Sequence, residues 1–157
     1  MTTLSYPSNE FPVFPSLSID VPDDWEALIV DNTVLAAGAP HEERTFKPNI
    51  CVSVDRHPGS RTIEDAAAAT AGALEAAEDY TEIGREFREV LGAPGFRIEG
   101  SFIMQDVGTL FQASHIAIIQ HAGSYDIVHA IATCSASQAK DLVPTMREAL
   151  DSLRKTN

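Results

Sequence analysis

Apolar and polar residues alternate with a period of two over much of the chain, which is typical of β-strands. The segment Leu17–Val21 alternates in this way and is stopped by Pro22. Two short apolar runs follow, at residues 28–30 and 33–37, with turn-forming residues between them. We therefore expect a strand over 17–21 and at least one more strand from the two short runs.

The segment Phe46–Asp55 predicts a further strand with one apolar face. Pro48 lacks a backbone N–H and forces the preceding residue to extend, so it fits only at the start or edge of a strand. Asn49 can then bond a neighbouring backbone group through its side-chain amide. Successive side chains alternate between the two faces, with Ile50, Val52 and Val54 on one and Cys51, Ser53 and Asp55 on the other.

A helix is expected directly after this strand. Thr62 stands where a capping residue belongs, and acids in the first turn interact favourably with the helix dipole. One stripe at helical spacing comprises Ile63, Ala66, Ala67, Thr70, Ala71, Leu74 and Ala77. Because these side chains are mostly methyl groups, the helix either lies unusually close to a sheet or leaves a shallow apolar groove beside it.

The region 80–134 predicts an antiparallel meander. Residues 81–91 carry charges between apolar positions, as expected near a sheet edge, and a turn is predicted at 92–95. The segments 110–121 and 125–134 are apolar on both faces, which is typical of central strands. A capping box at Ser135–Gln138 then predicts a final helix, with a kink at Pro144 on its solvent side.

Central strands that are apolar on both faces need covers on both faces. We therefore predict an α+β fold, an α/β/α-type sandwich of helices on a largely antiparallel sheet of six to seven strands. Residues 17–157 form a single domain in this prediction, and residues 1–16 form an extended N-terminal arm because of their prolines. The arm either packs across its own domain or is exchanged with a second copy, giving a homodimer.

The composition narrows the classes of partner. A formal charge of −12 repels nucleic acid and anionic lipid headgroups, so neither is an expected partner. Neither a signal-peptide pattern nor an apolar run long enough to span a membrane is present, so we expect a cytoplasmic protein. Cys51 and Cys134 lie in strand-like runs without metal-ligand spacing, and we expect buried thiols more than a disulfide or regulatory pair.

No catalytic or cofactor motif stands out in the sequence, so we predict a protein that is not an enzyme and needs no cofactor or metal. His115 and His121 share a strand face but lie roughly 20 Å apart, too far to hold one ion together. The face of His129 depends on register: it joins them if residue 117 pairs with 129 and points away if 118 does. The alternative is a hydrolase whose serine, histidine and aspartate come together only in the fold.

The order of motifs resembles a known group of proteins. Ser18-Ile19-Asp20-Val21-Pro22 with Trp25, then Phe46-Lys47-Pro48-Asn49-Ile50-Cys51-Val52, then a helix, a meander and a last helix, is similar to the actinobacterial LpqN/LpqT family and, more distantly, to DcrB-like and PsbP-like proteins. The resemblance spans about residues 17–154. It implies helices on an antiparallel sheet and no established catalytic residues. The lipoprotein members carry a lipobox cysteine near the N-terminus, whereas the first cysteine here is Cys51, which argues against an envelope anchor.

Members of these families act as binding proteins or adaptors, some linked to envelope lipids, photosystem assembly or the chaperoning of secretion effectors. The resemblance and the missing motifs together favour a binding or adaptor domain for a protein segment or an apolar, lipid-like molecule. A cytoplasmic chaperone for apolar segments of a secreted protein is the alternative. The candidate binding residues are Trp25, Asn49, Ala67, Ala71 and Leu74, although a lone tryptophan such as Trp25 is more often a plug at one end of the core.

Overall fold

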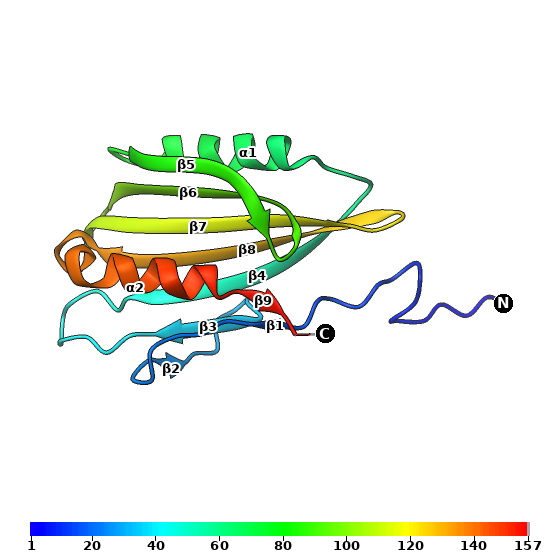
Figure 1. Ribbon diagram of the computed structural model, residues 1–157, viewed down its shortest axis with the longest axis horizontal. Coiled ribbons are helices and arrows are strands. Elements are labelled where there is room, and N and C mark those ends of the chain that lie inside the picture. Colours follow the sequence, from blue (N-terminus) through cyan, green and yellow to red (C-terminus); the bar gives the residue numbers. More distant parts are fainter. Residues whose placement is uncertain (157) are drawn as a thin grey trace.

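The computed structural model describes residues 1–156. Its main element is a seven-stranded antiparallel sheet in the order β2-β3-β4-β8-β7-β6-β5 (Figure 1). In chain order the strands are β2 (Glu26–Ala27), β3 (Leu35–Gly38), β4 (Asn49–Pro58), β5 (Thr81–Val90), β6 (Ala93–Met104), β7 (Gly108–Gln120) and β8 (Ser124–Ser135). The helices are α1 (Ile63–Glu75) and α2 (Ala139–Asp151), the latter preceded by the 3-10 turn Ala136–Gln138. The predicted α+β fold is confirmed.

The two helices cover opposite faces of the sheet. Alternate residues of β7 show this directly, because Phe111 and Ala113 belong to the core that contains α2, whereas Ile116 and Ile118 belong to the core that contains α1. The α2 core is the larger one, and its fully buried members include Ile50, Val52, Val128, Met146 and Leu150. The strands β7 and β8 lie between the two cores, which confirms their predicted central position.

Two very short strands close the α2 side. β1 (Leu17–Ser18) pairs with β9 (Arg154–Lys155) in a separate two-stranded sheet, and the Arg154 guanidinium bonds the Asp20 carboxylate at 3.1 and 3.2 Å. The expected strand over 17–21 is therefore only two residues long, and the apolar run 28–30 forms no strand. Neither β2 nor β9 was expected, because two residues are too few to show a period.

The strand β4 follows its prediction. Ile50, Val52 and Val54 pack into the α2 core, and the alternate residues face α1. The side-chain Nδ2 of Asn49 donates to the carbonyl of Lys47 at 3.0 Å, which fixes the bend at Pro48 where the strand begins. Asn49 is thus a structural joint at the start of β4.

The helix α1 begins as expected. The Thr62 hydroxyl accepts a hydrogen bond from the backbone N–H of Asp65 at 3.1 Å, the standard side-chain cap of a first turn. Ala66, Ala67 and Ala71 are buried against β6 and β7. The small side chains therefore bring the helix close to the sheet.

Two details near the chain turns differ from or refine the predictions. The turn between β5 and β6 consists of Leu91 and Gly92, both at positive φ (59° and 70°), and the following residues already belong to β6. The predicted turn at 92–95 is therefore wrong, because a two-residue turn of this type suffices to join the strands. The capping box at Ser135 and Gln138 is present, and α2 continues through Pro144, which is exposed.

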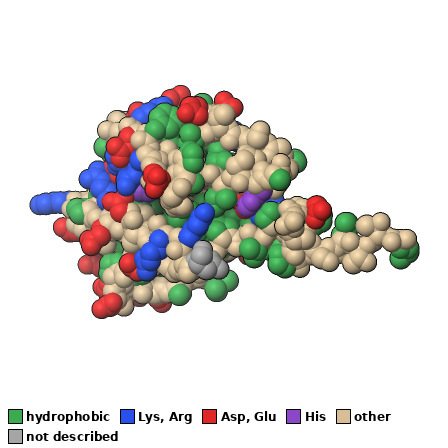
Figure 2. Space-filling model, turned by 45° about the vertical axis from the view of Figure 1, so that its right-hand side comes forward, with side chains coloured by type: hydrophobic (Ala, Val, Ile, Leu, Met, Phe, Trp, Pro, Cys, Tyr) green, Lys and Arg blue, Asp and Glu red, His purple; other side chains and the backbone are tan. Residues whose placement is uncertain are grey.

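The first residues of the chain extend from the body of the domain (Figures 1 and 2). Near residue 12 the segment is held by Arg56, which donates to the Pro12 carbonyl and whose guanidinium lies 4.4 Å from the centre of the Phe14 ring. Whether this segment meets a second copy stays a prediction.

Candidate binding groove beside α1

The helix α1 covers only part of its face of the sheet. It joins β4 to β5 and packs mainly on β6 and β7, so it covers the neighbouring strands β8 and β4 less completely on this face. Tyr125 and Thr133 of β8 are buried on this face. The residues between them and their neighbours on β4 are only half-buried: Cys51, Ser53, Ile127, His129 and Ile131.

A groove of about 420 Å³ lies along this boundary. Its helical wall consists of Ala66, Ala69, Ala73 and Leu74 together with Thr70, whose hydroxyl donates to the Ala66 carbonyl at 2.9 Å. Its floor comes from β7, β8 and β4: Gln112, Ser114, Ile116, Ile127, His129 and Asp55. Small-molecule sites commonly occupy roughly 300–1,000 Å³ and combine apolar walls with a few polar groups, and the groove has both properties.

The most unusual polar group of the groove is the imidazole of His129. Its Nε2 atom is shielded from solvent and has no hydrogen-bond partner among the described residues. Burial lowers the pKa of His129 to about 4, and the nearby charge of Asp55 opposes this shift only in part. The ring is therefore neutral at neutral pH, and a buried polar atom without a partner costs about 1–3 kcal/mol.

Another polar group of the floor, the Gln112 amide, has a hydrogen-bond partner. The Gln112 amide donates to the Thr133 hydroxyl at 3.3 Å, so these two side chains on adjacent strands satisfy each other. Two charged residues of opposite sign, Asp55 and Arg61, also line the groove. Neither forms a salt bridge with any of residues 1–156.

The residues predicted to bind a ligand are not all brought together. Leu74 lines the groove, whereas Ala67 and Ala71 are buried beneath α1. Trp25 is buried in the core on the opposite face, and Asn49 bonds backbone at the start of β4.

The sequence reasoning missed His129 as a groove residue. Its face depends on strand register, and the structure pairs it with Ile116, so it faces α1 while His115 faces α2. His129 therefore points away from His115 and His121, as one of the two alternatives had it, although its strand partner is residue 116 and not residue 118. The polar residues Ser114 and Gln112 at alternate positions of β7 were the available signal, because they mark the same face as incompletely apolar.

One histidine is hydrogen-bonded to an acid. Among the described residues, the side-chain hydrogen bond of a histidine joins His121 Nε2 to Asp126 Oδ2 at 2.9 Å, and none joins a histidine to a serine. Asp126 is fully buried; burial would raise its pKa, but hydrogen bonds from Arg56 and His121 hold that pKa below its usual value. This cluster supports the root of the N-terminal arm through Arg56.

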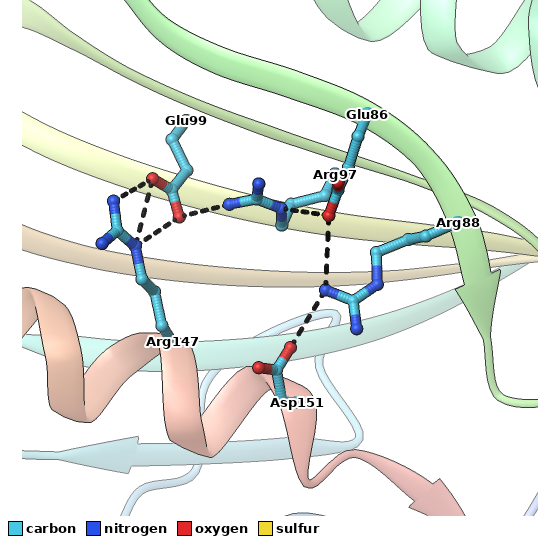
Figure 3. Close-up of polar contacts among 6 residues, drawn as sticks. All are labelled: Glu86, Arg88, Arg97, Glu99, Arg147 and Asp151. Atoms are coloured by element: carbon cyan, nitrogen blue, oxygen red, sulfur yellow. Dashed lines mark hydrogen bonds and ion pairs between the residues drawn. The ribbon is translucent and has the colours of Figure 1, made fainter.

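A second charged cluster lies on the α2 face (Figure 3). Glu99 of β6 is 2% exposed and accepts hydrogen bonds from Arg147 of α2 and Arg97 of β6. Burial would raise the pKa of Glu99, but the two guanidinium groups hold it below its usual value. The chain of ion pairs continues from Arg97 through Glu86 and Arg88 to Asp151.

The two cysteines are free thiols on opposite faces of the sheet, and burial raises the pKa of both, to about 11 for Cys134. Residues 1–156 contain no group of three or more side chains suited to hold a metal ion. Within the same residues, neither helix has the length and apolar character needed to cross a membrane.

Comparisons with known proteins support the fold. No protein-family model matches the chain, and the comparison with curated proteins finds no match. Among solved structures, LpqN of Mycobacterium tuberculosis, which is involved in cell envelope biogenesis, has a TM-score of 0.78 at 16% identity, with 93% of this chain and 86% of that chain covered.

Two further structures extend this likeness. The cyanobacterial PsbP of Synechocystis has a TM-score of 0.57 at 11% identity over 99% of this chain and 98% of its own. A Pseudomonas aeruginosa protein of unknown function has a TM-score of 0.59 at 12% identity over 87% and 95%. The chain therefore shares its fold with LpqN and with a PsbP-like protein, as the sequence resemblance implied.

Proposed function

We propose that this domain is a non-enzymatic binding module whose groove beside α1 takes an apolar, lipid-like molecule. The observation that carries the proposal is the groove of about 420 Å³ beside α1, whose helical wall is formed chiefly by alanine methyl groups and Leu74. Binding a ligand that removes such apolar surface from water lowers the free energy.

The shape of the site supports a ligand more than a reaction. Ala66, Ala69 and Ala73 present only methyl groups, so an apolar chain can lie along the helix without meeting a bulky side chain. His129 has no serine or acid within hydrogen-bonding distance among residues 1–156, so the arrangement lacks the activated nucleophile that a hydrolase uses. The cell-envelope role of LpqN is compatible with a lipid-like ligand.

Two neighbouring alanines of α1 provide the test. Ala69 and Ala68 are both exposed on the helix, but only Ala69 lines the groove. Ala69→Leu places a branched side chain in the space for the ligand, so we expect it to weaken binding of the fluorescent apolar probe N-phenylnaphthylamine about tenfold, measured by titration. Ala68→Leu is the matched control and is expected to bind the probe like the unmodified protein.

Two results would contradict the proposal. One is the absence of saturable probe binding to the unmodified protein. The other is equal probe affinity for the Ala69→Leu and Ala68→Leu variants, because the probe would then bind elsewhere on the surface.

A further inference from the structure

The strand β5 is an edge of the main sheet, and within residues 1–156 it pairs with β6 alone (Figure 1). Its residues from Thr81 to Glu89 are exposed, except for Gly84, which is half-buried. An exposed edge strand presents a row of unpaired backbone N–H and C=O groups to which another strand can bind. The edge of β5 is therefore suited to receive a strand from another molecule.

The charges on β5 follow an unusual order. Edge strands usually carry charges that discourage pairing, because a strand that approaches at random meets like charges. On β5 the order is Arg85-Glu86-Phe87-Arg88-Glu89. When this segment is reversed about its central phenylalanine, each arginine takes the place of a glutamate and each glutamate that of an arginine. The segment is therefore complementary in charge to an antiparallel copy of itself.

We infer that β5 binds the β5 strand of a second copy of this protein in antiparallel orientation, with Phe87 opposite Phe87 of the second copy. Arg85 then lies opposite Glu89 of the second copy, and Glu86 lies opposite its Arg88, so every charge faces one of opposite sign. The two main sheets become continuous through this pairing. The inference goes beyond the proposed ligand site and does not depend on it.

The regular part of β5 is also symmetric about Phe87. The pairing of β5 with β6 is interrupted by a bulge between Glu82 and Gly84, and it ends at Val90. The uninterrupted segment is therefore 84–90, and its middle residue is Phe87. At its ends, Val90 meets Gly84 of the second copy, where no heavy atom lies within 4 Å of the position of a Cβ. The whole regular strand of both copies can thus pair without a clash between these two residues.

This register also matches the two faces of the sheet. Phe87 pairs with Phe96, which belongs to the α1 core, so the odd-numbered residues from 85 to 89 lie on the α1 face. Glu86 and Arg88 lie on the α2 face, in the ion-pair chain (Figure 3). Residues directly opposite each other in an antiparallel pair point to the same side of the sheet. Every pair in the proposed register joins two residues of the same face.

The side chains of this segment are accessible to a second copy. Those of Arg85, Glu86 and Arg88 contact other charges of their own chain, yet they remain 42%, 50% and 37% exposed. Glu89 is exposed and forms no salt bridge with any of residues 1–156. Because exposed ion pairs within one chain contribute little, these side chains can turn to a second copy at small cost. Phe87, 57% exposed, loses contact with water in the same step.

The oligomeric state of the full chain tests the inference. We expect sedimentation velocity, in about 0.15 M salt, to show dimers at a protein concentration of about 100 µM. Glu89→Arg places arginines opposite each other, and Arg85→Glu places glutamates opposite each other. Each variant alone is expected to weaken dimerisation about tenfold or more, because favourable cross-strand pairs become repulsive.

A mixture of these two variants gives the sharpest result. In a mixed dimer, the arginines at 85 and 89 of the Glu89→Arg chain face the glutamates at 89 and 85 of the Arg85→Glu chain, so every pair is again of opposite sign. We expect the mixture to form heterodimers about as tight as the unmodified dimer, at a concentration at which each variant alone is mainly monomeric.

A matched control is Glu43→Arg, which makes the same change in charge in an exposed loop between β3 and β4. It is expected to dimerise like the unmodified protein. Glu89→Arg reduces the net charge of −12, so a weaker dimer cannot be attributed to greater repulsion between whole molecules. Thermal unfolding checks that each variant is folded.

Three results would overturn the inference. The first is an unmodified protein that stays monomeric at about 100 µM. The second is a Glu89→Arg variant that dimerises as tightly as the unmodified protein, because the copies would then meet through another surface. The third is a mixture of the two variants that stays as monomeric as each variant alone. None of these results bears on probe binding in the groove beside α1.

Discussion

On each face of the sheet, one region lies beyond its helix. The two regions differ in whether their polar side chains are paired. On the α2 face, the side chains of β5 and β6 beyond the helix form an ion-pair chain that reaches back to α2 (Figure 3). On the α1 face, the less completely covered strands β8 and β4 present half-buried side chains and an unpartnered imidazole. One region is closed by paired charges, and the other remains a groove.

The two regions differ in how their buried polar groups are satisfied. Glu99 is as buried as a core residue, yet its carboxylate has guanidinium partners from two elements. His129 is less buried as a whole, yet its Nε2 has none among the described residues. A buried charge with all its partners holds the fold together, whereas a buried polar atom without a partner lowers the stability of the fold.

The largest predicted effect is a loss of folding stability at low pH, to which two histidines, one on each face of the sheet, contribute together. Burial lowers the pKa of both His115 and His129 to about 4, whereas an unfolded histidine titrates near about 6.5. As the pH falls below about 6.5, the unfolded chain takes up protons that the folded chain does not, so stability is lost until about pH 4. We expect each histidine to contribute on the order of 2 kcal/mol of this loss by about pH 5, measured by urea unfolding.

Single variants separate the two contributions. His115→Gln and His129→Gln should each flatten the stability profile between about pH 6.5 and pH 5, above the range in which Glu99 and Asp126 titrate. His129 borders the open groove, so water can hydrate its charged form more easily, and its contribution is expected to be the smaller one. A profile that neither variant changes would show that the two rings titrate normally in the folded protein.

The next effect tests whether the ion-pair chain is structural. Arg147→Ala leaves Glu99, 2% exposed, with Arg97 alone, and we expect a loss of about 2–3 kcal/mol in the free energy of unfolding. Arg154→Ala is the matched control, because its partner Asp20 is exposed and such pairs contribute less than about 1 kcal/mol. Equal losses in urea unfolding would contradict the structural role of the chain.

The sequence alone predicts most of the large elements. Alternation locates β4 and the strands of the meander, the apolar residues on both faces place β7 and β8 at the centre, and the methyl stripe locates α1. These patterns are local, so they are visible without the fold. The pairs β1–β9 and β2–β3 depend on contacts between distant or very short segments and leave no periodic trace.

The groove could be predicted only in part. The methyl stripe already suggested a groove beside α1, and Leu74 does line it. The position of α1, however, follows from topology, because the helix must connect β4 to the edge strand β5, and three strands, β8, β7 and β6, lie between them. The face of His129 follows from a register that the whole β7–β8 hairpin sets, and no residue near it in the sequence determines that register.

The smallest predicted effect is the change in stability caused by a larger side chain on the groove side of α1, compared with one on the side packed against the sheet. Ala67 is 4% exposed against the sheet, so Ala67→Leu overpacks the core and should cost about 1–3 kcal/mol. Ala69→Leu points into the groove, where there is room, and Leu and Ala have similar helix propensities, so stability should change by less than about 0.5 kcal/mol. Urea unfolding of both variants measures the difference. A large loss for Ala69→Leu would mean that the space beside α1 is too tight for a ligand, because a side chain that cannot fit there leaves no room for a chain of similar width.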